Sequence, residues 1–183
     1  MSGVVIDDVS LEKSGVYILM GGIDADTCRP VIEWILKNEL IEDPWAEMKL
    51  FINSPGGSLS DAFALIDVMR GATSQIHTIG IGEISSAGLL IFMSGTKGKR
   101  ILTPNTAILS HQFSWGSYGK EHELFAAQKA FDLASEMMIN HYMKCTGLSK
   151  KKIQEFLLPA EDRWLSAKEA LKLGICDEIK EIY

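Results

Sequence analysis

The sequence predicts a single α/β domain, and length, composition and patterning all support this prediction. The chain has 183 residues, enough for one hydrophobic core but few for two. Apolar residues make up 46% and charged residues 23%, a balance typical of a globular protein. Short apolar runs with strand character alternate with stretches of helical periodicity, which favours strand–helix–strand units that cross over with a right hand.

Strands are expected where a short apolar run ends at glycine, proline or asparagine. The expected strands span residues 16–20, 48–53, 76–81, 100–102, 106–110 and 175–179. Gly21 and Gly22 end the first run, and the segment Ser-Pro-Gly-Gly at 54–57 is a strong turn signal after the second. A turn at Pro104 separates the fourth run from the fifth.

Helices are expected where apolar residues recur at a period near 3.6. The expected helices span residues 27–40, 58–70, 85–94, 121–145 and 166–174. Pro30 is expected in a first turn, where proline is tolerated, and Gly71 just past a helix end. The long helix carries apolar residues spaced by sevens, and Ser166 with Glu169 forms a capping box. The second helix is expected to point four apolar residues inward: Phe63, Leu65, Ile66 and Met69.

Composition excludes several classes of function. The net charge of −6 argues against nucleic-acid binding, and the one cationic run, at 150–152, is interpreted as a solvated helix start. Cys28, Cys145 and Cys176 lie far apart, which argues against disulfides and a zinc site and fits a reducing compartment. The acidic N-terminus does not resemble a targeting segment, and no apolar stretch is long enough to cross a membrane. The expected protein is cytoplasmic, or a mature form from which a leader has been removed, and has no membrane partner.

Three predicted strands end in segments with unusual chemistry, at residues 54–57, 82–88 and 110–112. Ligands of open α/β sheets bind outside the carboxyl ends of strands, so the site is expected there. Ser86 and His111 are a candidate nucleophile and base, with Asp162 as the orienting carboxylate.

Backbone N–H groups of Gly57 and Ala87 are the candidate oxyanion donors. Each of these residues also has a simpler interpretation. In these simpler interpretations Ser85 or Ser86 only caps a helix, the glycine pair forms a tight turn, and Glu161 is a rival carboxylate to Asp162. The segment is also not a G-x-S-x-G elbow, because residue 84 is isoleucine.

The order of these motifs is more specific than any one of them. The chain contains, in this order, the motifs INSPGG, GEISSAG, GTKGKR followed by PN and HQ, and DRWLSAKEA. With these motifs, the sequence from Val16 to the C-terminus resembles the proteolytic subunits of ATP-dependent Clp proteases. The resemblance implies a ClpP-like fold, related to crotonases, of repeated strand–strand–helix units with a protruding "handle" helix. It implies one domain, 1–183, with a head at about 1–112 and 146–183 and a handle at about 113–145.

The resemblance also implies the activity of a serine endopeptidase that hydrolyses unfolded proteins or peptides. Ser86 is then the nucleophile, His111 the general base and acid, and Asp162 the orienting group, with Gly57 and Ala87 forming the oxyanion hole. Residues 112–119 are the edge strand that pairs with substrate. The implied substrate-binding residues are Gly56, Ser58, Leu59, Gln112 and Phe113. No cofactor is implied, and the partners are copies of the chain in seven-membered rings, forming a tetradecamer, and a Clp-type ATPase unfoldase.

The sequence departs from the family pattern at several positions. Ala87 stands where methionine is usual, Phe113 where proline is usual, and Trp164 where phenylalanine is usual. Fewer residues precede Val16 than the family's axial hairpin and first helix occupy. An alternative is therefore a non-catalytic or self-sufficient ring subunit, of phage or accessory type, that lacks the usual ATPase partner. A third hypothesis is acyl-CoA chemistry on the crotonase fold, which lacks the Ser/His/Asp set.

Overall fold

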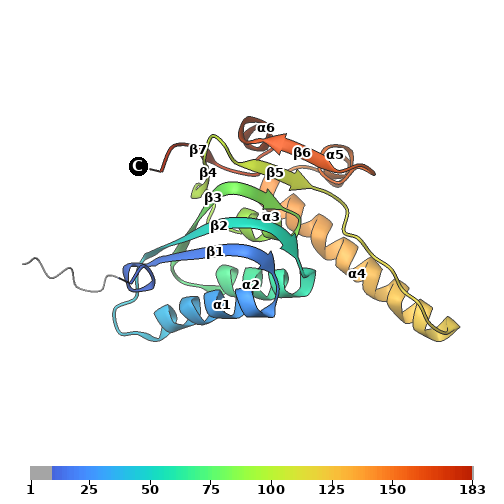
Figure 1. Ribbon diagram of the computed structural model, residues 1–183, viewed down its shortest axis with the longest axis horizontal. Helices are drawn as coiled ribbons and strands as arrows, with labels where there is room; N and C mark the ends of the chain where they lie inside the picture. The colour runs from blue at the N-terminus through green and yellow to red at the C-terminus, as the bar shows by residue number, and fades with distance from the viewer. Residues whose placement is uncertain (1–9, 183) are drawn as a thin grey trace, which may run out of the picture.

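A parallel-dominated sheet with helices packed on it forms the body of the protein, and one long helix projects from it (Figure 1). The structure is a computed structural model that describes residues 10–182. The strands are β1 (Val16–Ile23), β2 (Glu47–Gly57), β3 (Gln75–Ser85), β4 (Arg100–Leu102), β5 (Ala107–Ser110), β6 (Arg163–Ser166) and β7 (Glu178–Ile179). The helices are η1 (Glu12–Ser14), α1 (Ala25–Leu40), α2 (Leu59–Gly71), α3 (Ala87–Met93), α4 (Glu121–Thr146), α5 (Lys150–Phe156) and α6 (Ala167–Lys172).

The sheet confirms the predicted fold class. Its main order is β1-β2-β3-β4-β7, all parallel, and β5 pairs in parallel with the far end of β3. Strand β6, which the sequence did not predict, pairs antiparallel with β5. The long α4 corresponds to the expected handle.

Several predicted strand ends were wrong because glycine does not always end a strand. Strand β1 continues through Gly21 with a register shift between Met20 and Gly22. Strand β2 includes the whole segment 54–57, where Gly56 and Gly57 pair with β1, so this segment is not a tight turn. Strand β3 likewise continues past Ile81 to Ser85, whereas β7 is shorter than the run 175–179.

The helices follow the predicted order with small differences. A capping box of Asp24 and Thr27 starts α1 earlier than expected, so Pro30 lies in its second turn. Gly71 lies inside α2 rather than beyond it, and the predicted capping box of Ser166 and Glu169 is confirmed. The cationic run at 150–152 begins α5 and is exposed, which confirms its interpretation as a solvated helix start.

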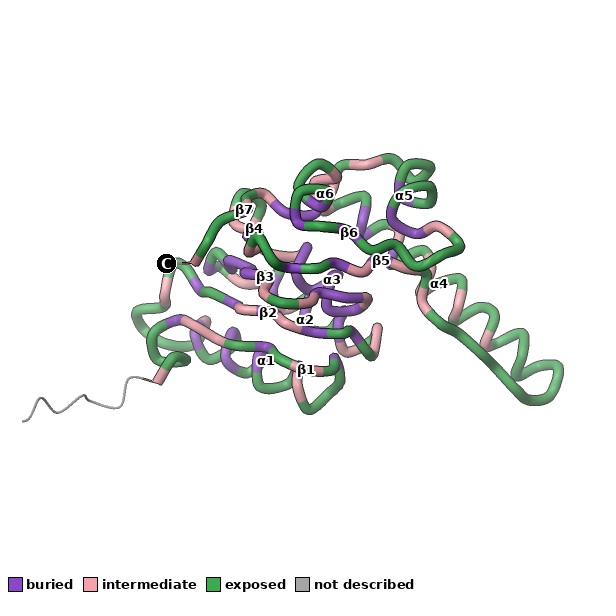
Figure 2. Tube along the Cα trace, turned by 45° about the horizontal axis from the view of Figure 1, so that its top comes forward, coloured by how far each residue is buried: buried purple, intermediate pink, exposed green. Residues whose placement is uncertain are grey.

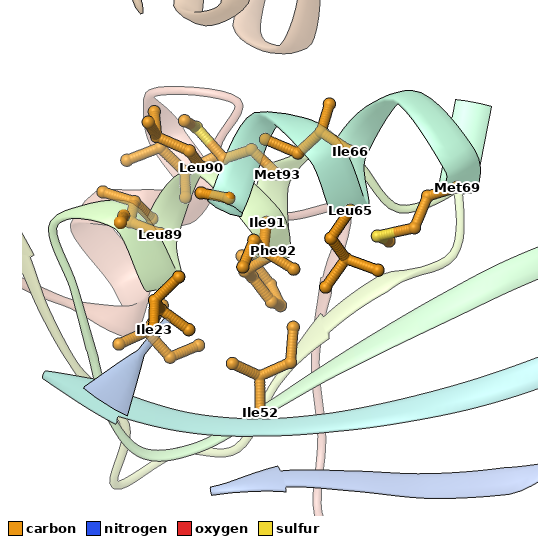
Figure 3. Packing of buried hydrophobic residues seen from close by; sticks show 14 of the residues in the cluster. Ile23, Ile52, Leu65, Ile66, Met69, Leu89, Leu90, Ile91, Phe92 and Met93 are labelled. Atoms are coloured by element: carbon orange, nitrogen blue, oxygen red, sulfur yellow. The ribbon is translucent and has the colours of Figure 1, made fainter. Parts of the chain in front are cut away.

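The hydrophobic core lies between the sheet and α1, α2 and α3. Every residue of α3 is buried, because this short helix packs against β2, β3 and α2. Figure 3 shows Phe92 and Ile91 between Ile52 of β2 and Leu65 of α2. The four residues of α2 that were expected to point inward are all buried. The short helix α3 is therefore held rigidly by apolar contacts on several sides.

Two surfaces outside this core are apolar and uncovered. Ile18 and Met20 of β1 are exposed on the face of the sheet away from α1. A cavity of about 350 Å³ on the sheet has a mixed lining, which is apolar at Phe51, Ile79 and Ile101 and charged at Glu47, Lys49 and Lys180. Figure 2 shows that the projecting part of α4 is mostly exposed, and its apolar residues there include Leu124, Phe125, Leu133 and Met137.

A buried ion pair joins the sheet to the end of α4. Arg100 is 1% exposed, and its guanidinium donates to both carboxylate oxygens of Asp177, at 2.8 and 2.6 Å, and to the carbonyl of Cys145 at 3.0 Å. Burial raises the pKa of Asp177, but hydrogen bonds from Arg100 and Gly98 outweigh this and hold it at about 2. Both charges are therefore compensated inside the fold.

A buried histidine makes a second connection between α4 and the body. His141 Nε2 lies 2.8 Å from the carbonyl oxygen of Leu90 in α3, and Arg70 Nη2 lies 2.7 Å from His141 Nδ1. A carbonyl only accepts and a guanidinium only donates, so the ring is neutral with its hydrogen on Nε2. Burial, with Arg70 and then Lys144, lowers the pKa of His141 to about 4, although the Leu90 bond opposes the shift.

This lowered pKa makes the protein sensitive to mild acid. An unfolded chain protonates His141 below about pH 6.5, whereas the folded protein does so only near pH 4. The free energy of unfolding should therefore fall by roughly 3 kcal/mol as the pH decreases through this window. Urea unfolding at pH 7 and 4.5 measures this fall. His141→Gln should reduce the difference between the two pH values, and an unchanged difference would contradict the assignment.

Candidate active site

The carboxyl ends of β2, β3 and β5 meet at one edge of the sheet because these strands are parallel neighbours. A small cavity of about 20 Å³ lies at this edge. It is lined by Gly57, Ser86, Ala87 and His111 of the sequence-predicted site, together with Leu59, Leu90, Phe113, Met138 and Tyr142. The fold thus brings together segments that are distant in the sequence.

Ser86 occupies a strained turn between β3 and α3. Its φ is 54° and its ψ is −123°, and it is the only non-glycine residue with positive φ within 10–182. Such backbone costs about 1–3 kcal/mol and concentrates at functional sites. Its side chain makes no capping hydrogen bond, whereas the hydroxyl of Ser85 donates to Glu83 at 2.7 Å. The side chain of Ser86 therefore does not cap α3, and a strained strand–turn–helix connection exists here without the G-x-S-x-G sequence.

The glycine pair is required by close packing rather than by a turn. The N–H of Gly56 donates to the Ser54 hydroxyl at 3.1 Å. A Cβ added to Gly56 would lie 2.5 Å from the Cβ of Ser86, and one added to Gly57 would lie 2.2 Å from the carbonyl oxygen of Ile23. Both residues have positive φ, 94° and 152°. Only glycine lets this strand end pass so close to Ser86.

His111 follows the last residue of β5, and the unpredicted strand β6 brings Asp162 beside it. Ser110 of β5 pairs with Arg163 of β6, so the residues next to this pair also become neighbours. His111 Nδ1 lies 4.0 Å from Asp162 Oδ1, and the Asp162 side chain is 67% exposed. This is an ion-pair distance, longer than a hydrogen bond. Within the described residues, Asp162 and not Glu161 is the carboxylate that contacts His111.

The predicted substrate-binding residues have different surroundings. Leu59 and Phe113 line the cavity, whereas Ser58 caps α2 by accepting from the N–H of Asp61. The side chain of Gln112 donates to the carbonyl of Leu158 at 3.1 Å and does not line the cavity at Ser86. Residues 112–119 make no strand pairing with the described part of the chain.

An aromatic cluster holds the segment 112–119 against α4. The rings of Phe113 and Trp115 lie 5.1 and 5.0 Å from that of Phe131, measured between centroids. An apolar groove of about 440 Å³ begins here and is lined by Leu59, Phe63, Phe113, Trp115 and Met137 among others. The groove therefore shares Leu59 and Phe113 with the cavity at Ser86.

Sequence reasoning missed the contribution of α4 to the site. Met138 and Tyr142 line the cavity and lie four residues apart, so they share one helix face. Burial raises the pKa of the Tyr142 hydroxyl, which therefore stays protonated. The pattern of apolar residues spaced by sevens includes Met138, but only the packing of α4 against α3 shows where this face points.

Comparison with known proteins agrees with the fold. The family model described as Clp protease matches residues 6–182. The chain belongs to the Clp protease family. An ATP-dependent Clp protease proteolytic subunit of Streptococcus mutans serotype c (strain ATCC 700610 / UA159) is 34% identical over 176 residues, 93% of this chain and 87% of that protein. The proteolytic subunit 2 of Thermobifida fusca (strain YX) is 34% identical over 138 residues, 75% of this chain and 67% of that protein.

Membership in the Clp protease family makes the chain a ClpP-like peptidase, which is a hydrolase. The family assignment favours peptide hydrolysis over the acyl-CoA chemistry that the crotonase relationship allowed. In the part of the chain that the structure covers, no group of His, Cys, Asp and Glu side chains has the arrangement of a metal site. No helix among residues 10–182 is long and apolar enough to cross a bilayer.

Proposed function

We propose that the chain is a serine endopeptidase in which Ser86 attacks the substrate carbonyl and His111 takes its proton. The observation that carries this proposal is the strained backbone of Ser86 in a cavity it shares with His111 and Gly57. In the first step the Ser86 oxygen bonds to the carbonyl carbon, and the carbonyl oxygen becomes an oxyanion. The N–H groups of Gly57 and Ala87 stabilise that charge. His111 then protonates the leaving amine, and water hydrolyses the acyl-enzyme by the reverse use of His111.

Asp162 orients His111 and stabilises the imidazolium that forms during both steps. The separation of 4.0 Å between Nδ1 and Oδ1 in the isolated chain must shorten by about 1 Å for a hydrogen bond. Catalytic hydrogen bonds often tighten only when substrate is bound, so this distance is compatible with the assigned role.

Extended, unfolded chains are the substrates that fit this surface. A chain pairing with residues 112–119 would satisfy backbone groups that have no strand partner within the described residues. An apolar substrate side chain next to the scissile bond would reach the groove that starts at Leu59 and Phe113. This arrangement supports Leu59 and Phe113 as substrate-binding residues better than Ser58 and Gln112, whose side chains bond within the fold, and better than Gly56, whose N–H bonds to Ser54.

Self-association into rings, as in a tetradecamer of two seven-membered rings, is part of the proposal. The exposed apolar residues of α4 and β1 support it, since contiguous apolar surface of this kind usually marks an interface. The two relatives are named as subunits of ATP-dependent Clp proteases, so a Clp-type ATPase is the proposed partner. A ring subunit that works without that ATPase remains the alternative.

A fluorophosphonate probe tests the nucleophile. The wild-type protein should be labelled, and Ser86→Ala should lose labelling and roughly 10⁶-fold in kcat, as removal of a triad nucleophile does. Ser85→Ala is the matched control and should leave labelling unchanged, because the Ser85 hydroxyl donates to Glu83. Intact mass spectrometry measures the adduct.

Two outcomes would reject parts of this proposal. A folded wild-type protein that is not labelled would favour a non-catalytic ring subunit. A single-chain mass by sedimentation velocity at micromolar concentration would reject the ring, although not the chemistry at Ser86.

A further inference from the structure

Two successive residues of α4, His141 and Tyr142, carry polar groups into the core next to the cavity at Ser86. They are 2% and 1% exposed. Polar groups buried this deeply are destabilising unless they find partners. Both residues do find partners, and the partners belong to the two separate elements that carry Ser86 and His111.

His141 connects to the helix that follows Ser86. Its Nε2–H donates to the carbonyl of Leu90, and the N–H of Leu90 donates to the carbonyl of Ser86 at 3.3 Å. The helical donor for the Leu90 carbonyl would be the N–H of Ser94, but that group donates to Ile91 instead. His141 therefore supplies the hydrogen bond that the end of α3 lacks, one turn away from the nucleophile.

Tyr142 connects to the residue that precedes His111. Its hydroxyl oxygen lies 2.7 Å from the hydroxyl oxygen of Ser110, and the Ser110 hydroxyl also donates to the carbonyl of Leu157. Because Ser110 has a single hydroxyl hydrogen, which it gives to Leu157, Tyr142 is the donor in its bond with Ser110. Strand β5 ends at Ser110, so this contact fixes the point from which His111 leaves the sheet.

The backbone ladder alone does not fix the separation of the two catalytic side chains. After the last paired residues of β3 and β5, the N–H of Ser86 donates to the carbonyl of Leu109 at 3.0 Å. His111 lies beyond that bond, and α3 leaves the sheet directly after it. The tilt of α3 and the direction of the chain at 110–111 therefore need support beyond the β3–β5 ladder, and the pairing of Ser110 with Arg163 of β6 supplies only part of it.

We infer that His141 and Tyr142 are positioning residues, which together set the Ser86–His111 separation from one turn of α4. Arg70 completes the arrangement, since its guanidinium donates to His141 Nδ1 and keeps Nε2 as the donor toward Leu90. Phe63 packs edge-on against the His141 ring, with centroids 5.8 Å apart and an angle of 88°, which restricts ring rotation. The inference rests on the proposed function of Ser86 and His111.

The test compares Tyr142→Phe, His141→Leu and His141→Gln with the wild type. Tyr142→Phe removes one hydroxyl, and His141→Leu removes both imidazole hydrogen bonds. Glutamine can still donate to Leu90 and accept from Arg70, so His141→Gln is the rescue variant. Matched controls are Tyr17→Phe, at the start of β1, and His122→Gln, on the exposed first turn of α4.

The rate of fluorophosphonate acylation and the kcat for a peptide substrate should fall by roughly 10- to 100-fold in Tyr142→Phe and His141→Leu. KM should change by less than about threefold, because both side chains are almost completely buried. His141→Gln should recover to within about fivefold of the wild type, and both controls should equal it. Near-ultraviolet circular dichroism establishes that each variant is folded at the assay temperature.

A second measurement does not depend on activity. The ¹⁵N signals of the His111 imidazole should shift in Tyr142→Phe and His141→Leu and stay in place in both controls. If the wild type is inert toward the probe, the proposed function fails, and these shifts alone decide whether the two residues position His111. If His141→Leu does not fold, Tyr142→Phe decides. Wild-type acylation in folded Tyr142→Phe, or unmoved His111 signals, would overturn the inference.

Discussion

Gly56→Ala should lower the peptidase rate by roughly 100-fold and destabilise the fold. The new methyl group would lie 2.5 Å from the Cβ of Ser86 and 2.8 Å from the carbonyl oxygen of Ser85, so Ser86 must move. Displacing a nucleophile by about 1 Å costs roughly 100-fold in rate. The φ of 94° adds about 1–3 kcal/mol of strain for alanine, and overpacking adds about 1–3 kcal/mol more. Fluorophosphonate acylation and urea unfolding measure the two effects.

Gly21→Ala separates strain from contact. Gly21 has a φ of 111°, but a Cβ there would meet nothing within 4 Å. This control should lose stability through strain and keep the acylation rate of the wild type. Equal acylation by Gly56→Ala and Gly21→Ala would show that Gly56 does not shape the position of Ser86.

Asp177→Ala should cause the largest loss of stability among single substitutions outside the site. It leaves the Arg100 guanidinium, which is 1% exposed, buried without its carboxylate. Breaking a buried pair in this way costs about 3–5 kcal/mol, which corresponds to a fall in Tm of roughly 10 °C for a domain of this size. Differential scanning calorimetry measures the shift.

Two comparisons define what the Asp177 result means. Glu178→Gln removes an exposed partner of Lys180, 3.0 Å away, and should change stability by less than about 0.5 kcal/mol. The double variant Arg100→Met with Asp177→Leu removes both charges and should recover most of the loss. A double variant as unstable as Asp177→Ala would mean that the contact of Arg100 with Cys145 matters more than the pairing.

Sequence patterns correctly predicted the ends of those helices and strands that are set by residues close by in the sequence. Strand β4 matches its predicted residues, and the capping box of Ser166 depends only on Glu169 three residues later. The segment 54–57 was predicted wrongly because its glycines serve a distant contact, with Ile23 and Ser86. A turn signal and a close approach use the same residue type, and only the fold distinguishes them.

The site shows the same division between local and distant causes. Ser86, His111, Gly57 and Ala87 were predicted from strand ends and motif order, and the structure brings all four to one cavity. Their catalytic roles stay predictions. Asp162 reaches His111 through β6, an edge strand of four residues whose polar pattern gives little signal. Tyr142 lies far along the chain from Ser110, and their hydrogen bond could not be predicted from spacing.

The positive φ of Ser86 also has a consequence for how the residue at this position evolves. A glycine at this position would adopt the same backbone without strain, so selection for stability alone favours glycine over serine there. A lineage that lost its peptidase activity would no longer be held at serine and would drift toward residues that relax the turn. On the proposed role of Ser86, the residue at this one position thus records whether hydrolysis is still under selection, independently of how well the rest of the fold is preserved.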